Sequence, residues 1–145
     1  MIDLFRGRLG KHRFHPMLVH FPSALYPFSV VMDGLGLWYD NSAFHLAALY
    51  SLEGALGMSV LAIIYGAIDF LQIDSKHSAW KTAGFHALLN ACWFIMFGVL
   101  LFYRLKHNEL GVGYVSVAGL TVAGMFFSNY LGGELIVKHK IGIEP

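Results

Sequence analysis

Four long apolar runs dominate this chain, and they leave room for little else. They cover about residues 17–38, 46–73, 85–105 and 112–137. A helix needs about 20 apolar residues to cross the roughly 30 Å hydrocarbon core of a bilayer, and each run reaches that length. Backbone groups in lipid must be satisfied within the spanning segment, which favours helices. Strands of a membrane barrel would be about 10 residues long and would alternate in polarity. The runs therefore predict four transmembrane helices.

The composition fits the same class. Of the 145 residues, 57% are hydrophobic and 13% are charged, against about 45–50% and about 25% in soluble domains. A soluble domain of this size cannot bury so much apolar surface. The net charge of +1 offers no basic stripe for nucleic acid, and the hydrophobicity excludes disorder. The single cysteine, Cys92, allows neither an internal disulfide nor a motif for covalently attached haem.

The connections between the runs are short, which makes consecutive helices antiparallel. We therefore expect an all-α integral membrane protein, a four-helix up-down-up-down bundle in one domain over residues 1–145. Eight of the ten Lys and Arg residues fall on one side, and by the positive-inside rule that side is cytoplasmic. The expected location is the bacterial inner membrane with both termini in the cytoplasm. The eight residues are Arg6, Arg8, Lys11, Arg13, Lys76, Lys81, Lys138 and Lys140.

Histidines gather at the same boundary, where six of the eight in the chain are expected. His20 and His86 lie inside the first and third runs with apolar residues on both sides. These two helices are diagonal and parallel in such a bundle, so the two imidazoles are expected at similar depth. Two imidazoles at one depth could ligate one haem iron from opposite sides. We therefore expect haem b on His20 and His86, with His15 and His139 as a weaker second pair.

Other polar residues near this depth could support a bound haem. Asn90 follows His86 by one helical turn, and Asp69 ends the second run, so both could orient imidazoles. Basic residues at the boundary could pair with haem propionates. These residues are Arg13, Lys76, Lys81 and Lys138.

Two alternatives use the same residues or none of them. A bare transition metal could bind nitrogen and oxygen ligands here, although no two candidates share His-x-x-x-His spacing on one helix. The candidate ligands are His15, His20, His86, His139, Asp69 and Glu134. The second alternative is a cofactor-free accessory subunit of a larger membrane complex.

Two acidic residues are expected near the opposite membrane boundary, Asp33 and Glu53. Ionisable groups at membrane depth are costly and usually face the bundle interior. We expect both to point inward, where they could bond to one another, to Tyr26 or Ser51, or to Arg104. A proton path or a contact with a quinone head group is the alternative role.

The motifs around these residues resemble a family of predicted bacterial inner-membrane proteins, the domain-of-unknown-function family 2231. The run from His15 to Pro22 reads His-Pro-Met-Leu-Val-His-Phe-Pro and is similar to the opening signature of that family. Three further motifs match less specifically, and Lys140 stands where the family pattern has Gly. They are Gly66 to Phe70 (Gly-x-x-Asp-aromatic), His86 with Asn90, and Gly132 to Leu135 followed by His139.

The resemblance covers essentially the whole chain and implies a four-helix membrane domain. Relatives joined to Rieske-type or cytochrome c domains imply electron transfer. This chain carries no such domain, so a redox partner would be a separate subunit. We thus expect a small cytochrome b-like electron carrier or redox-complex subunit rather than a stand-alone enzyme. Its partners would be the lipid bilayer, other redox subunits or further copies, and a quinone.

Overall fold

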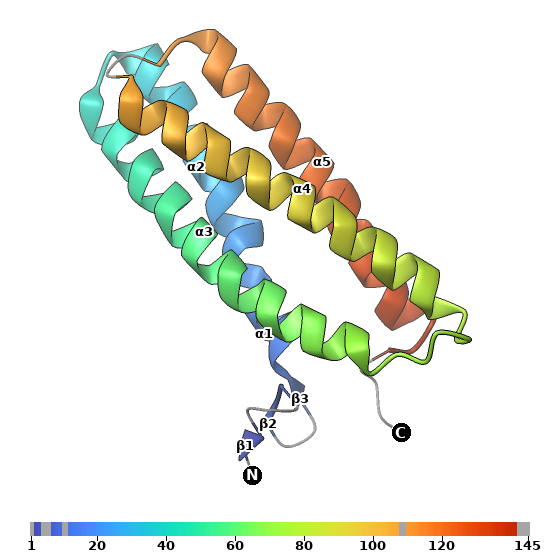
Figure 1. The fold of residues 1–145 in the computed structure, drawn as a ribbon. Coiled ribbons are helices and arrows are strands. Elements are labelled where there is room, and N and C mark those ends of the chain that lie inside the picture. The colour runs from blue at the N-terminus through green and yellow to red at the C-terminus, as the bar shows by residue number, and fades with distance from the viewer. Residues whose placement is uncertain (1, 4–6, 10–11, 108–109, 142–145) are drawn as a thin grey trace.

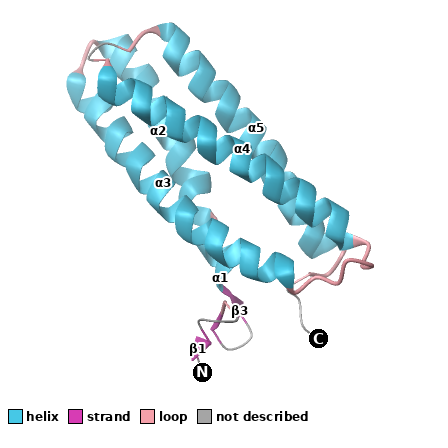
Figure 2. Cartoon of the chain, viewed as in Figure 1, coloured by secondary structure: helices cyan, strands magenta, loops and turns pink. Residues whose placement is uncertain are grey.

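The computed structural model describes residues 2–3, 7–9, 12–107 and 110–141. Four long helices account for most of them: α2 (His20–Tyr39), α3 (Ser42–Leu71), α4 (Ala79–Lys106) and α5 (Val112–Val137). A single-turn helix, α1 (Phe14–Leu18), precedes α2. Before it lie three two-residue strands in antiparallel order: β1 (Ile2–Asp3), β2 (Arg8–Leu9) and β3 (His12–Arg13). The long helices run side by side (Figures 1 and 2), so the predicted all-α bundle is confirmed.

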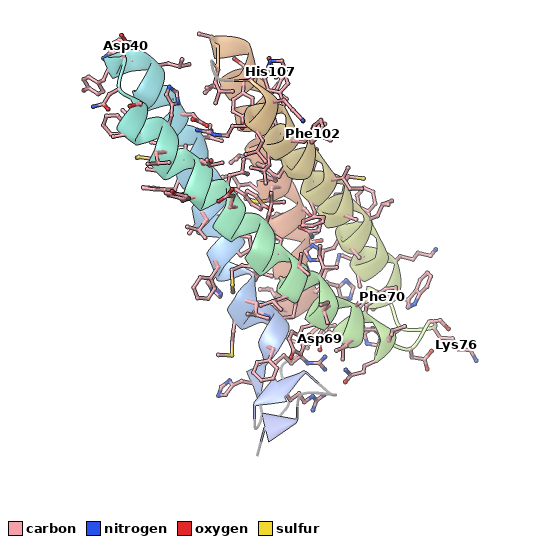
Figure 3. All side chains as sticks on the ribbon, turned by 60° about the vertical axis from the view of Figure 1, so that its left-hand side comes forward. Asp40, Asp69, Phe70, Lys76, Phe102 and His107 are labelled. Carbon is pink, nitrogen blue, oxygen red and sulfur yellow. The ribbon has the colours of Figure 1, made fainter. Side chains whose placement is uncertain are left out.

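The bundle has two ends that differ in what they carry. At the terminal end lie both chain termini and the connection from α3 to α4 (Figure 1). At the distal end lie the connections from α2 to α3 and from α4 to α5. Figure 3 labels Asp40 and His107 at the distal end and Asp69 and Lys76 at the terminal end. Each long helix packs against its neighbours in sequence, and α2 also packs against α5, which closes the bundle.

Among the described residues, three helices are long and apolar enough to cross a membrane by length and composition: α3, α4 and α5. The first predicted span corresponds to α2, which does not reach that hydropathy. It is the shortest of the four and contains two prolines and Asp33, and these lower its apolar content. Asp33 nevertheless lies in the bundle interior, where it is almost fully buried.

The predicted helix ends also shift. α3 and α4 begin four and six residues before the apolar runs do, because a helix can continue past the hydrocarbon into polar residues. Asn41 caps α3 by accepting a hydrogen bond from the amide of Ala43, as N-cap residues do. The first run divides at Val19, which separates α1 from α2. The short strands were not foreseen, since two-residue strands leave no periodic pattern.

The apolar core fills the middle and the distal half of the bundle. Tyr26 stacks on Phe97 with the ring centroids 3.6 Å apart, and its hydroxyl lies 3.0 Å from that of Ser59. Small buried side chains on α3 let the neighbouring backbones approach closely. The core residues are Tyr26, Leu52, Ala55, Phe97, Leu100, Ala118, Val122 and Met125.

The outer surface of the bundle is apolar. Large hydrophobic side chains such as Ile95 and Leu120 are 63% and 72% exposed, which water would penalise and lipid would not. The outer surface therefore fits a chain embedded in a bilayer.

Candidate functional site

The terminal half of the bundle holds a cavity of about 850 Å³ between the four long helices and α1. Its walls are mostly apolar, with Tyr26, Trp93 and Phe97 toward the core. Ligand sites in proteins are commonly cavities of about 300–1,000 Å³ with apolar walls and a few polar groups. The polar side chains around this cavity include His15, His20, Asp69, His86, Asn90 and Asn129. Five of the six site residues predicted from the sequence therefore line this cavity or its rim, and His139 does not.

Two of these histidines lie next to each other, with the edge of one ring toward the other ring, and are called the facing pair. The imidazoles of His15, on α1, and His86, on α4, have centroids 6.4 Å apart and planes inclined at 79°. Two imidazoles that hold one metal from opposite sides have centroids about 6 Å apart, because each metal–nitrogen bond is about 2 Å. The spacing of His15 and His86 thus suits a single ion between them.

Hydrogen bonds fix the tautomer of both rings. His15 Nδ1 lies 2.8 Å from the carbonyl oxygen of Ala62, and His86 Nδ1 lies 2.8 Å from that of Ser128. A carbonyl only accepts, so each Nδ1 carries the proton and donates it. In a neutral imidazole the Nε2 atom then keeps its lone pair. Metal-binding histidines are held in this way, with the other ring nitrogen donating to a backbone carbonyl or a carboxylate.

A glycine makes room for each imidazole. A methyl group placed at Gly66 would lie 2.9 Å from Cε1 of His15, and one at Gly132 would lie 2.9 Å from Cε1 of His86. Gly66 follows Ala62 by four residues, and Gly132 follows Ser128 by four. Within a helix these are the residues that bond to the same carbonyls. The same local arrangement therefore occurs twice, once on α3 and once on α5.

Asn90 and Asp69 have different roles from one another. Asn90 Nδ2 donates to the carbonyl oxygen of His86 at 2.9 Å and lies 3.2 Å from both nitrogens of that ring. It therefore contacts the histidine that it was expected to orient. Asp69 instead accepts from Arg13 at 2.7 Å, with both side chains largely buried. This ion pair joins β3 to the end of α3 at the cavity rim.

His20 and His139 lie apart from the facing pair. His20 is the first residue of α2, is exposed and lines the rim of the cavity. No hydrogen bond or ring contact joins it to another residue that the structure describes. His139 lies beside His77, with centroids 6.5 Å apart, and 3.2 Å from the Ser78 hydroxyl. His77 Nδ1 accepts from the amide of Ala79, so its Nε2 carries the proton, unlike those of the cavity pair.

Trp93 also lines the cavity. Its indole Nε1 is buried and has no hydrogen-bond partner among the described residues. Buried donors without partners are uncommon in folded proteins. A bound group with an acceptor atom would satisfy this one.

No three His, Cys, Asp or Glu side chains come together as a metal site within residues 12–107 and 110–141 or the described strands before them. A bare zinc-type site needs three or four protein ligands. The six ligands proposed for such a site from the sequence are spread out: four line the cavity or its rim, His139 lies beside His77, and Glu134 lies in the last turn of α5.

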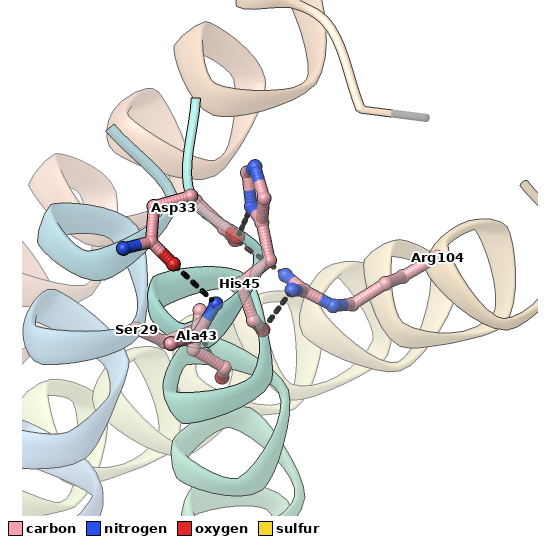
Figure 4. Close-up of polar contacts among 7 residues, drawn as sticks. Ser29, Asp33, Ala43, His45 and Arg104 are labelled. Carbon is pink, nitrogen blue, oxygen red and sulfur yellow. Dashed lines mark hydrogen bonds and ion pairs between the residues drawn. The ribbon is translucent and has the colours of Figure 1, made fainter. Parts of the chain in front are cut away.

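A second polar cluster lies at the distal end, where Asp33 is 2% exposed (Figure 4). Arg104 donates to Asp33 Oδ2 at 2.5 Å and to the backbone carbonyl of His45. His45 Nδ1 lies 2.9 Å from Asp33 Oδ1. Arg104 is thus one of the several partners considered for Asp33 from the sequence, and the contacts of Asp33 tie α2, α3 and α4 together. The expectation that Glu53 also points inward is wrong, because Glu53 is exposed on α3.

One comparison with known proteins, the match to a family model, indicates a membrane protein. The model of the family described as "Predicted membrane protein (DUF2231)" matches residues 11–145. A 5-methyltetrahydropteroyltriglutamate--homocysteine methyltransferase from Mesembryanthemum crystallinum is 32% identical over 69 residues, covering 41% of this chain and 9% of its own length. A homologous methyltransferase from Oryza sativa subsp. japonica is 33% identical over the same length and coverage.

The chain thus spans about a tenth of the length of the curated relatives that it matches. A likeness this short does not indicate the function of the chain. No solved structure matches the chain. The family match extends over nearly the whole sequence and includes all the helices. The chain therefore belongs to the family of predicted membrane proteins DUF2231.

Proposed function

We propose that the cavity binds one haem b and that the chain is a small electron-transfer protein or redox subunit of the bacterial inner membrane. The supporting observation is the facing pair of His15 and His86, 6.4 Å apart, with each Nδ1 donating to a carbonyl. Haem supplies four nitrogen ligands itself and needs only two axial ones from the protein. A site with two neighbouring imidazoles and, among the described residues, no third His, Cys, Asp or Glu grouped with them fits that need better than it fits a bare ion.

His15 would hold the haem iron in place of His20, the residue expected from the sequence. Both histidines belong to the same motif and lie within two turns of each other. Only His15 has a carbonyl partner, a glycine beside its ring and a facing imidazole. His20 would contact the edge of a bound group at the cavity rim.

The remaining cavity residues would hold and shield the haem. The apolar walls would exclude water from it, and the Trp93 indole could donate to an acceptor on it. Arg13 lines the cavity and carries the charge that a propionate would need, although it already pairs with Asp69. The haem would supply one-electron oxidation and reduction. His15 and His86 would hold it, and the carbonyls that accept from each Nδ1 set the tautomers of the two rings.

The position of the cavity determines where electrons would enter and leave. It lies at the terminal end, which we expect to face the cytoplasm from the distribution of Lys and Arg. The described basic residues there, including Lys81 and Lys138, could attract an acidic redox partner or anionic lipid; Arg6 and Lys11 lie outside the described residues. A quinone in the bilayer could act as the other electron donor or acceptor.

Visible spectroscopy of the purified full-length protein tests this proposal. A Soret band with α and β bands on reduction is expected in the parent and in the control variant His107→Ala. The variants His15→Ala and His86→Ala should lose the low-spin spectrum, and His20→Ala should keep it. Metal without a Soret band would support the non-haem alternative. A colourless, metal-free protein that takes up no added haem would leave the accessory-subunit alternative.

A further inference from the structure

We infer that the outer face of α3 is the contact surface for a second copy of this chain, with the carboxyl groups of two Glu53 residues paired at the centre. This inference does not depend on haem. It rests on the position of Glu53, on the pattern of the helix face around it and on the symmetry of a membrane pair.

Glu53 lies inside the predicted membrane span of α3 and points outward. It is seven residues, or about 10 Å along the axis, inside the apolar run that begins at residue 46, and 18 residues, or about 27 Å, from Leu71. Its side chain is exposed, and no hydrogen bond or ion pair reaches it from the part of the chain that the structure describes.

The other acidic side chains in the helices differ from Glu53. Asp33 pairs with Arg104 in the interior, and Asp69 pairs with Arg13. Glu134 lies in the last turn of α5, near the bundle end. Ionisable side chains within a membrane almost always face a protein interior or a water-filled cavity and pair with one another. Glu53 meets that condition only if another protein surface covers it.

The surface around Glu53 has the pattern of a helix-packing seam. We call it the Glu53 face, and its exposed residues recur at alternating steps of four and three. They are Leu46, Tyr50, Glu53, Gly57, Val60 and Ile64. The buried side of α3 shows the same steps, and there they pack against the bundle. Its residues are Ala48, Leu52, Ala55, Ser59 and Ala62. A 3.5-residue repeat is the period at which two helices keep one seam in contact, so α3 carries a seam on each side.

A second copy is the occupant that Glu53 itself favours. All copies enter the membrane with the same orientation, because the same Lys and Arg residues fix it. In a two-fold pair about the membrane normal, equivalent residues meet at equal depth. Glu53 would then meet Glu53, and a carboxyl group is both donor and acceptor when protonated. Two carboxyl groups that hold one or two protons complement each other without any other residue. One turn away, a methyl group at Gly57 would meet nothing within 4 Å, so the helix backbones can come close there.

Disulfide cross-linking in membranes tests this contact in the full-length protein. The exposed Cys92 is first replaced by Ser, and Gly57→Cys is then compared with Phe127→Cys on α5. Both positions are exposed and lie 15 residues from the distal end of their helices. Oxidation should give several-fold more cross-linked dimer from Cys at position 57 than from the control. Equal cross-linking at both positions, or none at position 57, would overturn the inference.

Glu53 itself is tested in the Gly57→Cys background. Glu53→Leu should lower the cross-linked fraction several-fold, whereas Glu53→Gln, which keeps a donor and an acceptor, should retain most of it. An unchanged yield with Glu53→Leu would contradict the role of the carboxyl. A protein that is monomeric in nanodiscs, or whose α3 is covered by a different subunit, would overturn the second copy as occupant.

A second cysteine pair protects the test against misfolding, which helical circular dichroism and thermal unfolding would report. Tyr50→Cys and its control Leu120→Cys are both exposed and lie eight residues from the distal end of their helices. Oxidation should again give several-fold more cross-linked dimer from the cysteine on α3 than from its control on α5. None of these measurements uses a haem spectrum, so a failure of the proposed function leaves their outcome interpretable.

Discussion

Gly132 on α5 lies directly against the imidazole of His86 on α4: a methyl group at Gly132 would be 2.9 Å from Cε1 of that ring. Gly132 thus leaves the space that the His86 ring needs to reach the Ser128 carbonyl, one turn earlier on the same helix. Gly66 does the same for His15 on α3. Two helix glycines therefore leave the space in which the His15 and His86 rings lie.

Replacing Gly132 with Ala should destabilise the protein, although the same change usually favours a helix. Alanine gains about 1 kcal/mol over glycine in a helix interior, but overpacking costs about 1–3 kcal/mol, and the clash moves His86. We expect a lower unfolding temperature and a lost or shifted haem spectrum. The control is Gly98→Ala on α4, where an added methyl meets nothing within 4 Å; it should be neutral or stabilising. Equal effects at Gly132 and Gly98 would contradict the role of Gly132.

The sequence was sufficient to predict the helical bundle, because four apolar runs with short connections allow few arrangements of the helices. For Asp33 it offered several partners, and the packing of α2 against α3 and α4 selects Arg104 among them. The pairing of His15 rather than His20 with His86 could not be predicted. It depends on the break at Val19 and on a contact with Ala62, 47 residues away in the sequence. The membrane depth expected from the sequence is too similar for two histidines in one motif to tell them apart.

The outward direction of Glu53 could not be predicted either. The sequence shows that Glu53 is costly in lipid but not which side of α3 faces the core. That choice follows from the packing of Ala48, Leu52 and Ala55 against the other helices. A signal was present in the two seams of α3, whose steps of four and three run along opposite sides of the helix.

Cysteine labelling should place the terminal end of the bundle in the cytoplasm. In a Cys92→Ser background, a cysteine at Ser78 should react with a membrane-impermeant reagent only in inverted vesicles. A cysteine at Asn41, in the distal connection, should react only in intact spheroplasts. We expect this orientation because eight of the ten Lys and Arg residues belong to the terminal side of the bundle. The reverse pattern would move the cavity and its histidines to the periplasmic side.

Trp93→Phe should have opposite effects on the empty and the loaded protein. The Trp93 Nε1 is buried without a partner among the described residues, and such a donor costs about 1–3 kcal/mol. Removing it should raise the unfolding temperature of the haem-free protein or leave it unchanged. If a bound haem accepts from Nε1, the variant should bind added haem more weakly, as measured by titration at the Soret band. Unchanged affinity would show that the indole donor does not contact the bound group.

Removing one partner of the ion pair at the distal end should lower the stability of the bundle, because the other charge would stay buried without a partner. Asp33 and Arg104 are 2% and 9% exposed, and removing one partner of a buried pair costs about 3–5 kcal/mol because the other charge is left unpaired. Arg104→Met and Asp33→Leu should therefore each destabilise strongly. The double variant should be more stable than the sum of the two losses predicts, since it leaves no buried charge. Unfolding by a denaturing detergent measures the three variants in a double-mutant cycle, with Lys106→Met, which removes an exposed charge on the same helix, as control. Additive losses would show that Asp33 and Arg104 act independently, and that the distal cluster depends on His45 instead.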